Sequence, residues 1–292
     1  MPANQAKPER RIRAALALEA EDATNAGMTG YMAHVVTQTT IPHSRVDDHQ
    51  FQRSNGLVTV TISDIAGVGL PYGSYPRLLL AWISSEAVKT GDSLLEFGPT
   101  LSGFMAELGL LPTGGRWGTI HRLREQMVRL FSSSIACHYA DRTADSGSQL
   151  LVAKDYNLWW DPKTPDQAAL WGSTVRLSGD FFDSITAHPV LLSLPVLRVL
   201  KQSPMSLDIY CWLTYRHHTL QRKTSVPWEA LQWQFGAGYP DSVDGLRDFK
   251  KRFKQAAERV RAVYPAARFT SDRTHLVLLP PLKKSARLSA TH

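Results

Sequence analysis

The sequence has little cysteine, with only Cys137 and Cys211 among 292 residues. Two isolated cysteines cannot form a disulfide framework or a structural zinc site, and we interpret both as buried thiols. Long apolar runs are also absent. No run approaches the roughly 20 residues that span a bilayer, and the N-terminus lacks the apolar core and cleavage site of a secretory signal. These absences predict a soluble, cytoplasmic protein with no membrane role.

Motifs typical of enzymes are missing as well. The segment TGGRWG, residues 113–118, has neither the Lys-Ser/Thr of a phosphate-binding loop nor the spacing of a dinucleotide-binding turn. His217 and His218 have no third ligand at a metal-site spacing, so we expect a capping or solvent-exposed role. Cys137 and His138 are adjacent on a predicted strand and point to opposite faces, which excludes a local nucleophile and base pair. We expect no catalytic residue, no metal and no cofactor.

Acidic residues are outnumbered by basic ones. The chain has 33 Lys and Arg against 26 Asp and Glu, a formal net charge of +7. Such a surface attracts nucleic acid or anionic lipid through long-range fields. With 43% hydrophobic residues, the chain can build the cores of two domains of roughly 150 residues each.

The positive charge is concentrated in the segment LRDFKKRFKQAAERVRAVY, residues 246–264. Its apolar residues recur at helical spacing and share one stripe: Leu246, Phe249, Phe253, Ala257, Val260 and Tyr264. Between Arg247 and Arg261 there are seven basic and two acidic residues, a local net charge of +5. The pattern predicts a helix with one face on the core and a basic face turned to water or to a polyanion.

This basic face is the sharpest candidate for DNA contact, although an ordinary solvated helix face is the alternative. Each Lys or Arg that neutralises a phosphate releases condensed counterions, which favours binding at low salt. Flexible lysines suit phosphates, whereas an arginine can also read guanine edges. We predict DNA contacts by Arg247, Lys250, Lys251, Lys254 and Arg261, with the two arginines as the candidates for base reading.

Residues 1–56 are rich in Ala, Thr, Gln and Asn and predict a partly ordered N-terminal arm. The arm contains a short basic amphipathic segment at 10–20 and the polar tract HSRVDDHQFQRSNG at 43–56. The alternative is a helix that docks on a partner or on the body of the protein.

A first domain is predicted over residues 57–185. The alternating run LVTVTIS at its start indicates a strand, and Thr100 fits the N-cap of a helix. Helical patterns occupy 77–89, 101–110 and 117–131, with a short strand at 94–97. The alternating runs SSIACHYAD and QLLVAKDYNLWW, joined by the loop RTADSGS, predict a hairpin. This order is typical of a winged helix, although ordinary α+β scaffolds show it too.

The helix at 117–131 is the candidate recognition helix of the first domain. We expect its apolar residues to face the core: Trp117, Ile120, Leu123, Met127 and Phe131. Glycines before this helix let a backbone approach phosphate, and a helix N-terminus favours anions, although a plain turn explains the glycines equally well. We predict DNA contacts by Arg116 and Thr119 at its N-terminal end and by Arg122, Gln126 and Arg129 on its outward side.

A second domain, predicted over residues 186–292, repeats the first in outline. Helical patterns at 207–220, 228–235 and 242–264 precede the strand-like run THLVLLP. Two copies of one architecture predict an α+β protein of tandem winged-helix domains that follow the N-terminal arm.

Several long segments carry a resemblance. LPYGSYPRLLLAWISSEAVKTGD, LSGFMAELGLLPTGGRWGTIHRLREQMVRLF, LDIYCWLTYR, VPWEALQWQFG and FKKRFKQAAERVRAVYP, in this order between residues 56 and 281, resemble the plasmid-encoded RepA family of replication initiators. The resemblance implies tandem winged helices that bind repeated sites (iterons) in a plasmid origin. It also implies that the protein opens the duplex and helps to recruit the host initiator and the replicative helicase. The arm falls outside the resemblance.

Two other functions stay open. A DNA-nicking replication enzyme would need a nucleophilic Tyr and a metal cluster, and the sequence supplies tyrosines but no cluster. A winged-helix transcriptional repressor would differ in its target and not in its chemistry. Double-stranded DNA is the partner that all three share, and a homodimer is compatible with each of them.

Overall fold

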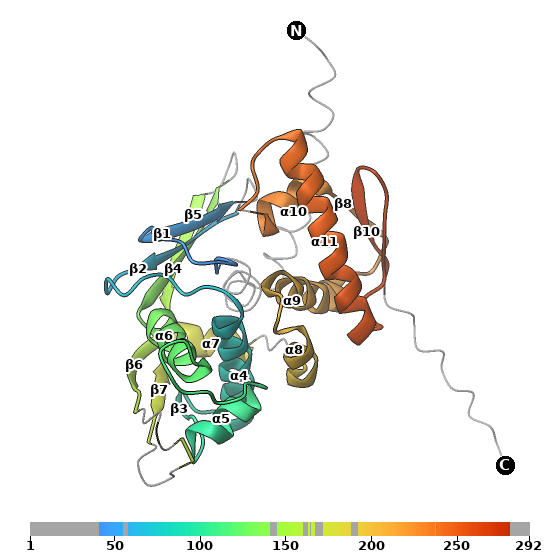
Figure 1. The fold of residues 1–292 in the computed structure, drawn as a ribbon. Helices are drawn as coiled ribbons and strands as arrows, with labels where there is room; N and C mark the ends of the chain where they lie inside the picture. Colours follow the sequence, from blue (N-terminus) through green and yellow to red (C-terminus); the bar gives the residue numbers. More distant parts are fainter. Residues whose placement is uncertain are drawn as a thin grey trace, which may run out of the picture.

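The computed structural model describes residues 41–54, 58–140, 145–159, 163, 165–166, 172–187, 192–236 and 238–280. Within these residues the chain forms eight helices and ten strands, which build three antiparallel sheets. Figure 1 shows a first half, residues 41–187, beside a second half, residues 192–280, whose orange and red helices lie on the right. No helix in these ranges is long and apolar enough to span a bilayer.

A four-stranded sheet occupies one side of the first half. Its strands, in spatial order, are β1 (Gln50–Ser54), β2 (Val58–Asp64), β4 (Ser133–Ala140) and β5 (Asp145–Leu151). In the register of β2 with β4, Val60 lies opposite Cys137 and Ile62 opposite Ile135. All four side chains are buried, so this face of the sheet belongs to the core.

Part of the predicted arm belongs to this sheet. β1 falls inside the polar tract 43–56 and pairs with β2 along its whole length. Ile41 is fully buried, and Arg53 donates a hydrogen bond to the carbonyl of Gln234 in the second half. The tract is therefore held by long-range pairing that local composition does not reveal. The basic segment at 10–20 lies outside the described residues.

The other elements of the first half surround an aromatic core. They are α4 (Ser74–Thr90), β3 (Leu94–Glu96), α5 (Leu101–Glu107), α6 (Thr119–Phe131), β6 (Ala153–Asn157), β7 (Thr174–Leu177) and α7 (Gly179–Ala187). Trp82 stacks on Phe97 at 5.4 Å between ring centroids and meets Phe104 edge-on at 5.1 Å. The predicted N-cap is confirmed, because the Thr100 side chain accepts a hydrogen bond from the Gly103 N–H at 3.1 Å.

The second half has its own three-stranded sheet and core. Its elements are α8 (Leu194–Leu200), α9 (Pro204–Thr219), β8 (Thr224–Pro227), α10 (Trp228–Phe235), α11 (Val243–Val263), β9 (Phe269–Ser271) and β10 (His275–Leu278). Phe253 of α11 packs edge-on against Trp228 at 5.7 Å and Phe235 at 5.6 Å. Cys211, like Cys137, is buried, as predicted.

The same order of elements occurs in both halves. α4, β3, α5, α6, β6 and β7 in the first half correspond in order to α9, β8, α10, α11, β9 and β10 in the second. The two three-stranded sheets are ordered β3-β7-β6 and β8-β10-β9, so the third strand lies between the other two in each. The four-stranded sheet is an addition to the first unit only.

The predicted hairpin of the first half is only partly right. β4 and β5 do form a hairpin, but β5 begins at Asp145 inside the predicted loop and ends at Leu151. The rest of the predicted run QLLVAKDYNLWW continues as β6, which joins a different sheet through β7. An alternating pattern shows which residues are buried but not which strand is the partner. The sequence pattern therefore predicts one strand where the structure has two, β5 and β6.

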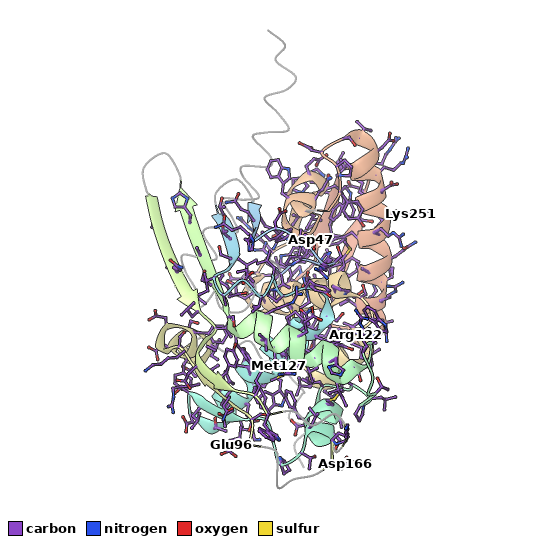
Figure 2. All side chains as sticks on the ribbon, turned by 60° about the vertical axis from the view of Figure 1, so that its left-hand side comes forward. Asp47, Glu96, Arg122, Met127, Asp166 and Lys251 are labelled. Carbon is purple, nitrogen blue, oxygen red and sulfur yellow. The ribbon has the colours of Figure 1, made fainter. Side chains whose placement is uncertain are left out.

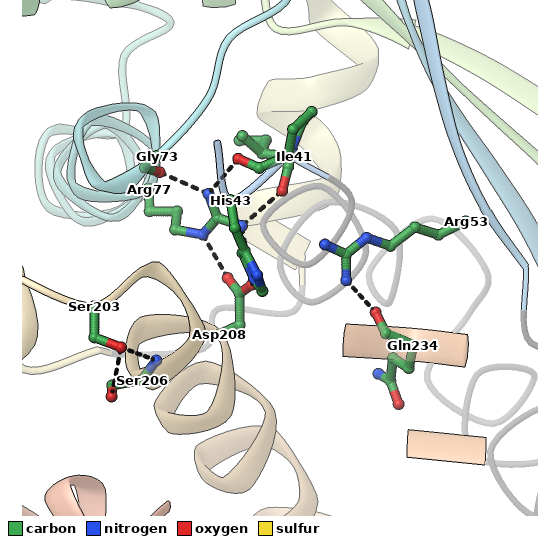
Figure 3. Close-up of polar contacts among 10 residues, drawn as sticks. Ile41, His43, Arg53, Gly73, Arg77, Ser203, Ser206, Asp208 and Gln234 are labelled. Carbon is green, nitrogen blue, oxygen red and sulfur yellow. Dashed lines mark hydrogen bonds and ion pairs between the residues drawn. The ribbon is translucent and has the colours of Figure 1, made fainter. Parts of the chain in front are cut away.

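A buried ionic cluster joins the two halves. Arg77 of α4 pairs with Asp208 of α9, and His43 lies 2.7 Å from the same carboxylate (Figure 3). Arg77 also donates to the carbonyls of Ile41 at 2.7 Å and Gly73 at 2.6 Å. The cluster therefore holds residues 41–43 of the predicted arm, α4 and α9 in one place.

Candidate nucleic-acid interface

Helix α11 begins at a well-defined cap and is oriented by its apolar stripe. The Ser242 side chain accepts a hydrogen bond from the Gly245 N–H at 3.0 Å. Phe249, Phe253, Ala257 and Val260 are buried, as the periodicity predicts. Burial of this stripe turns the opposite side of the helix to solvent.

Lys251 lies near the middle of that solvent side. It is exposed, and Figure 2 shows it directed away from the body of the protein. Lys254, one turn further on, is also exposed, and its ammonium lies 5.3 Å from the Trp228 ring centroid. These two lysines place positive charge where a phosphate backbone has direct access.

The other predicted residues of α11 already have partners within the protein. Arg247 pairs with Asp244 at 3.0 Å, and Arg261 pairs with Glu258 at 3.1 Å. Lys250 is half-buried and donates to the Arg273 carbonyl at 3.1 Å. Exposed ion pairs contribute little to stability, so a phosphate can replace Asp244 or Glu258 as the partner at small cost.

Two exposed arginines of α11 were not among the predicted contacts. Arg252 and Arg259 lie on the flank of the helix, beside the lysine face. Helical spacing separates them from Lys251 by roughly a quarter turn, so the pattern does not place them on the face that is predicted to contact DNA. Their charge was visible in the sequence, and they extend the basic surface sideways.

The structure places the predicted residues of α6 differently from the expectation. Gln126 and Arg129 are only 4% and 8% exposed, so their predicted outward orientation is wrong. Gln126 accepts a hydrogen bond from the Tyr72 N–H at 2.8 Å, and Arg129 donates to the Leu70 carbonyl at 3.0 Å. Both side chains hold the loop that precedes α4.

That loop passes very close to α6. A Cβ on Gly69 would lie 2.8 Å from an Arg129 nitrogen, and Gly69 has a φ of +90° that favours glycine. The helical pattern of α6 gave no sign that a loop some 60 residues earlier in the chain, around Gly69, covers its polar side. Tertiary contact therefore decides the role of Gln126 and Arg129.

The N-terminal end of α6 differs from the expectation as well. The helix begins at Thr119, and Trp117 is 77% exposed, not inward. The Arg116 guanidinium lies 5.2 Å from the Trp117 ring centroid. Thr119 accepts a hydrogen bond from the Thr113 N–H at 2.9 Å and closes the turn. An aromatic residue just before a helix follows no helical period, so the inward prediction for Trp117 failed.

Four residues form the exposed basic side of α6. Arg116 and Arg122 were predicted, whereas His121 and Arg124 were not, and all four are exposed. Arg122 donates to the Trp117 carbonyl at 3.2 Å from Nε and 3.0 Å from Nη2. In Figure 2 the turn with Arg122 lies on the side of the molecule where α11 carries Lys251.

Hollows lie on both sides of α6. One, of about 680 Å³, is lined by Val68, Arg116, His121, Arg124, Glu125, Val128 and Arg129. The second, of about 590 Å³, lies between α6 and the start of α9 and includes Arg122 and Lys201. We name the second hollow the junction pocket. The exposed side of α6 is thus a ridge of positive charge between two depressions.

The described residues show how two kinds of chemical group are arranged, metal ligands and thiols. Within these ranges no three or more His, Cys, Asp or Glu residues are grouped as metal ligands. Burial raises the pKa of the Cys137 thiol to about 11, so it is protonated at neutral pH. The side chains of His217 and His218 lie outside the described residues.

Comparisons with known proteins agree with this architecture. A family described as plasmid encoded RepA protein matches residues 70–234, from the loop before α4 to α10. The crystal structure of RctB domains 2 and 3 has a TM-score of 0.55 at 9% identity, covering 84% of this chain and 96% of that chain. A selenomethionine derivative of the same domains gives 0.56 at 9% identity, covering 87% and 98%. No curated protein matches. At such low identity the likeness to RctB concerns the fold alone.

Proposed function

The chain belongs to the family of plasmid-encoded RepA proteins, which are replication initiators, and from this premise we propose that it binds repeated sites (iterons) in a plasmid origin. Binding to the double-stranded repeats then favours opening of a neighbouring A·T-rich stretch. The energy of binding at several sites offsets the cost of bending or melting the duplex. Recruitment of the host initiator and the replicative helicase completes the proposed role.

The observation that carries this proposal is the exposed basic side of α11. Lys251 and Lys254 project from a helix whose other side is fixed in an aromatic core. A rigid helix that presents ammonium groups in a row can neutralise neighbouring phosphates without the entropic cost of ordering its backbone on binding.

We further propose that each half contains a winged-helix unit. The repeated order of helix, strand, helix, helix, strand, strand supports this proposal, as does the equal strand order of the two small sheets. In such a unit the helix after the tight turn lies in the major groove. This assigns α6 and α11 as the two recognition helices, with β6–β7 and β9–β10 as the wings.

The two helices have different tasks in the proposal. The lysines of α11 grip phosphates, whereas Arg122 on α6 has a fork of N–H groups that suits guanine edges. Arg116 and Trp117 lie at the end of α6 that would enter the groove first. Arg247 and Arg261 remain candidates for base reading on α11, because the acidic partner of each is exposed. Arg261 also donates to the Phe269 carbonyl at 3.4 Å and lies 4.2 Å from the centroid of that ring, so Arg247 is the freer of the two.

We propose that the protein acts without catalysing a covalent step. A nicking initiator needs a metal cluster and a nucleophilic Tyr; the sequence supplies tyrosines, but the described residues hold no group of three or more His, Cys, Asp or Glu that could bind a metal. Supercoiled origin DNA incubated with the protein and Mg²⁺ should stay supercoiled. A relaxed product with the protein attached to a 5′ end would overturn this part of the proposal.

Footprinting on the plasmid origin tests the initiator role. The expected result is protection of several direct repeats, each about two helical turns long, with unpaired thymines in the A·T-rich stretch beside them. Protection confined to a promoter, with no unpaired thymines, would support a transcriptional repressor instead. Light scattering of the complex would decide whether a monomer or a homodimer occupies each repeat.

A further inference from the structure

The junction pocket lies where the two halves meet. Its walls come from five parts of the chain: residues 43–45, residues 72–75 at the start of α4, residues 110–111 after α5, the N-terminal part of α6, and residues 201, 202 and 204 at the start of α9. Its volume of about 590 Å³ falls within the roughly 300–1,000 Å³ typical of ligand pockets. The pocket therefore has room for a group larger than a water molecule or a simple ion.

Three cationic side chains line the pocket: Arg45, Arg122 and Lys201. Arg122 and Lys201 donate to backbone carbonyls, those of Trp117 and Gly109, so these bonds leave their positive charge without a countercharge. Arg45 pairs with Asp47 at 3.0 Å, but both side chains are well exposed, so the pair is weak.

Among the described residues that line the pocket, only Glu125 carries a carboxylate, and that carboxylate already has a partner. Glu125 pairs with Arg129 at 2.6 Å. Ser74, Tyr72 and Tyr75 also line the pocket, and their side chains carry hydroxyl groups of the kind that can donate to an anion. Excess positive charge with hydroxyl donors is the environment that recognises a phosphate group.

The walls of the pocket are held in place by the buried cluster of Figure 3. His43 lines the pocket and contacts Asp208 at 2.7 Å, while Arg77 holds the carbonyls of Ile41 and Gly73. On the α9 side, the Ser203 side chain accepts a hydrogen bond from the Ser206 N–H at 3.2 Å. The pocket is thus formed before any ligand arrives, which lowers the cost of binding.

We propose that the junction pocket binds a phosphate group of the DNA backbone, between the contacts made by α6 and those made by α11. Arg45 and Lys201, which belong to neither recognition helix, are its new ligands. The inference rests on the proposed function, since it assumes that the chain binds DNA. It adds one anchored phosphate that links the two halves into a continuous DNA-binding surface.

The test compares a double variant, R45Q/K201Q, with the matched control K89Q/R222Q. The control also removes one exposed Lys and one exposed Arg, but from the end of α4 and from the segment before β8. Binding to an origin duplex is measured over a range of salt concentrations. One lost phosphate contact should lower the slope of log affinity against log salt by about 0.9, and the control should match the wild type. Equal slopes for both double variants would overturn the inference.

A second measurement locates the phosphate and does not depend on the folding of a variant. Each backbone phosphate of the duplex is replaced in turn by a neutral methylphosphonate. One replacement should weaken binding of the wild type but not of R45Q/K201Q. If no replacement distinguishes the two proteins, the pocket holds no backbone phosphate.

A third measurement distinguishes a phosphate of the DNA backbone from a free nucleotide as the ligand of the pocket. Titration of the protein with deoxyadenosine monophosphate should show no saturable binding. Binding that R45Q/K201Q abolishes would assign the pocket to a nucleotide and overturn the DNA assignment. If the wild type failed to bind origin DNA at all, the proposed function itself would fail. If R45Q/K201Q bound origin DNA like the wild type while K251A/K254A on α11 bound it more weakly, only this inference would be rejected.

Discussion

The guanidinium of Arg77 donates two hydrogen bonds to the carboxylate of Asp208, from Nε at 2.6 Å and from Nη2 at 2.9 Å. The two side chains are 1% and 0% exposed and come from different halves of the molecule. Burial alone would raise the pKa of Asp208, but the charge of Arg77 and the hydrogen bonds from His43 and Arg77 outweigh it and lower that pKa. This pair fixes how α4 meets α9, and with it the walls of the junction pocket.

Removing one charge of this pair should destabilise the protein strongly. Asp208→Asn leaves the Arg77 charge buried with only neutral acceptors, which costs about 3–5 kcal/mol. Urea unfolding followed by circular dichroism measures the loss. Asp155→Asn is the control, because its pair with Arg176 at 3.4 Å is exposed, and it should stay within about 0.5 kcal/mol of the wild type. Equal effects of the two variants would contradict the assigned role of Asp208.

The same cluster predicts how stability depends on pH. Burial, opposed by Asp208 and assisted by the charges of Arg77 and Arg53, lowers the pKa of His43 from 6.5. A lowered histidine pKa means that protonation favours the unfolded chain, so stability is complete above pH 6.5 and declines below it. The lowered pKa of Asp208 adds a further loss below about pH 4, the range of an unfolded carboxyl.

His43→Gln isolates the first of these two phases. Glutamine keeps an N–H for Asp208 but does not titrate. The free energy of unfolding of the wild type should fall more between pH 7 and pH 5 than that of the variant. Parallel curves for the two proteins over this range would show that His43 does not carry the effect.

Two arginines of α6 should behave in opposite ways. Arg122 is exposed, whereas Arg129 is bonded to the Leu70 carbonyl. Arg122→Ala should leave the midpoint of thermal unfolding unchanged and relax the preference among related DNA sites. Arg129→Ala should lower the midpoint but keep the preference. Selection from a library of randomised sites, together with thermal unfolding, measures both properties, and a reversed outcome would exchange the two roles.

Trp117, just before α6, and Trp82 of α4 should respond differently to truncation, because only Trp82 is buried. Trp117 is 77% exposed, while Trp82 is 4% exposed and donates from Nε1 to Glu107 at 2.6 Å. Trp82→Ala should cost about 3–5 kcal/mol of unfolding free energy. Trp117→Ala should cost little and weaken DNA binding, because its ring lies beside Arg116 on the proposed interface. A large loss of unfolding free energy from Trp117→Ala would show that Trp117 packs in the core, as the helical pattern predicts.

Sequence periodicity predicted the parts of the fold that depend on local pattern. The stripe of α11 is buried as expected because a 21-residue helix gives the period many repeats. The cap at Thr100 was predictable because it needs only its own neighbours. The repeated order of elements was also visible, although the strands of the first unit were assigned to the wrong partners.

The features that the sequence could not predict depend on contacts between distant segments. β1 is a polar strand that is held in the sheet by its pairing with β2, and nothing within residues 50–54 indicates burial. Gln126 and Arg129 look like surface residues until the loop around Gly69 covers them. The junction pocket combines residues 43–45, 122 and 201, which no spacing rule connects.

The central claim is that the lysine face of α11 binds the phosphate backbone of DNA. The most direct measurement is the salt dependence of origin-DNA affinity for K251A/K254A, with K89A/K223A as the control that removes two exposed lysines from the end of α4 and from the segment before β8. Loss of two phosphate contacts should reduce the slope of log affinity against log salt by about 1.8 and leave the control unchanged. An unchanged slope for K251A/K254A would contradict the account.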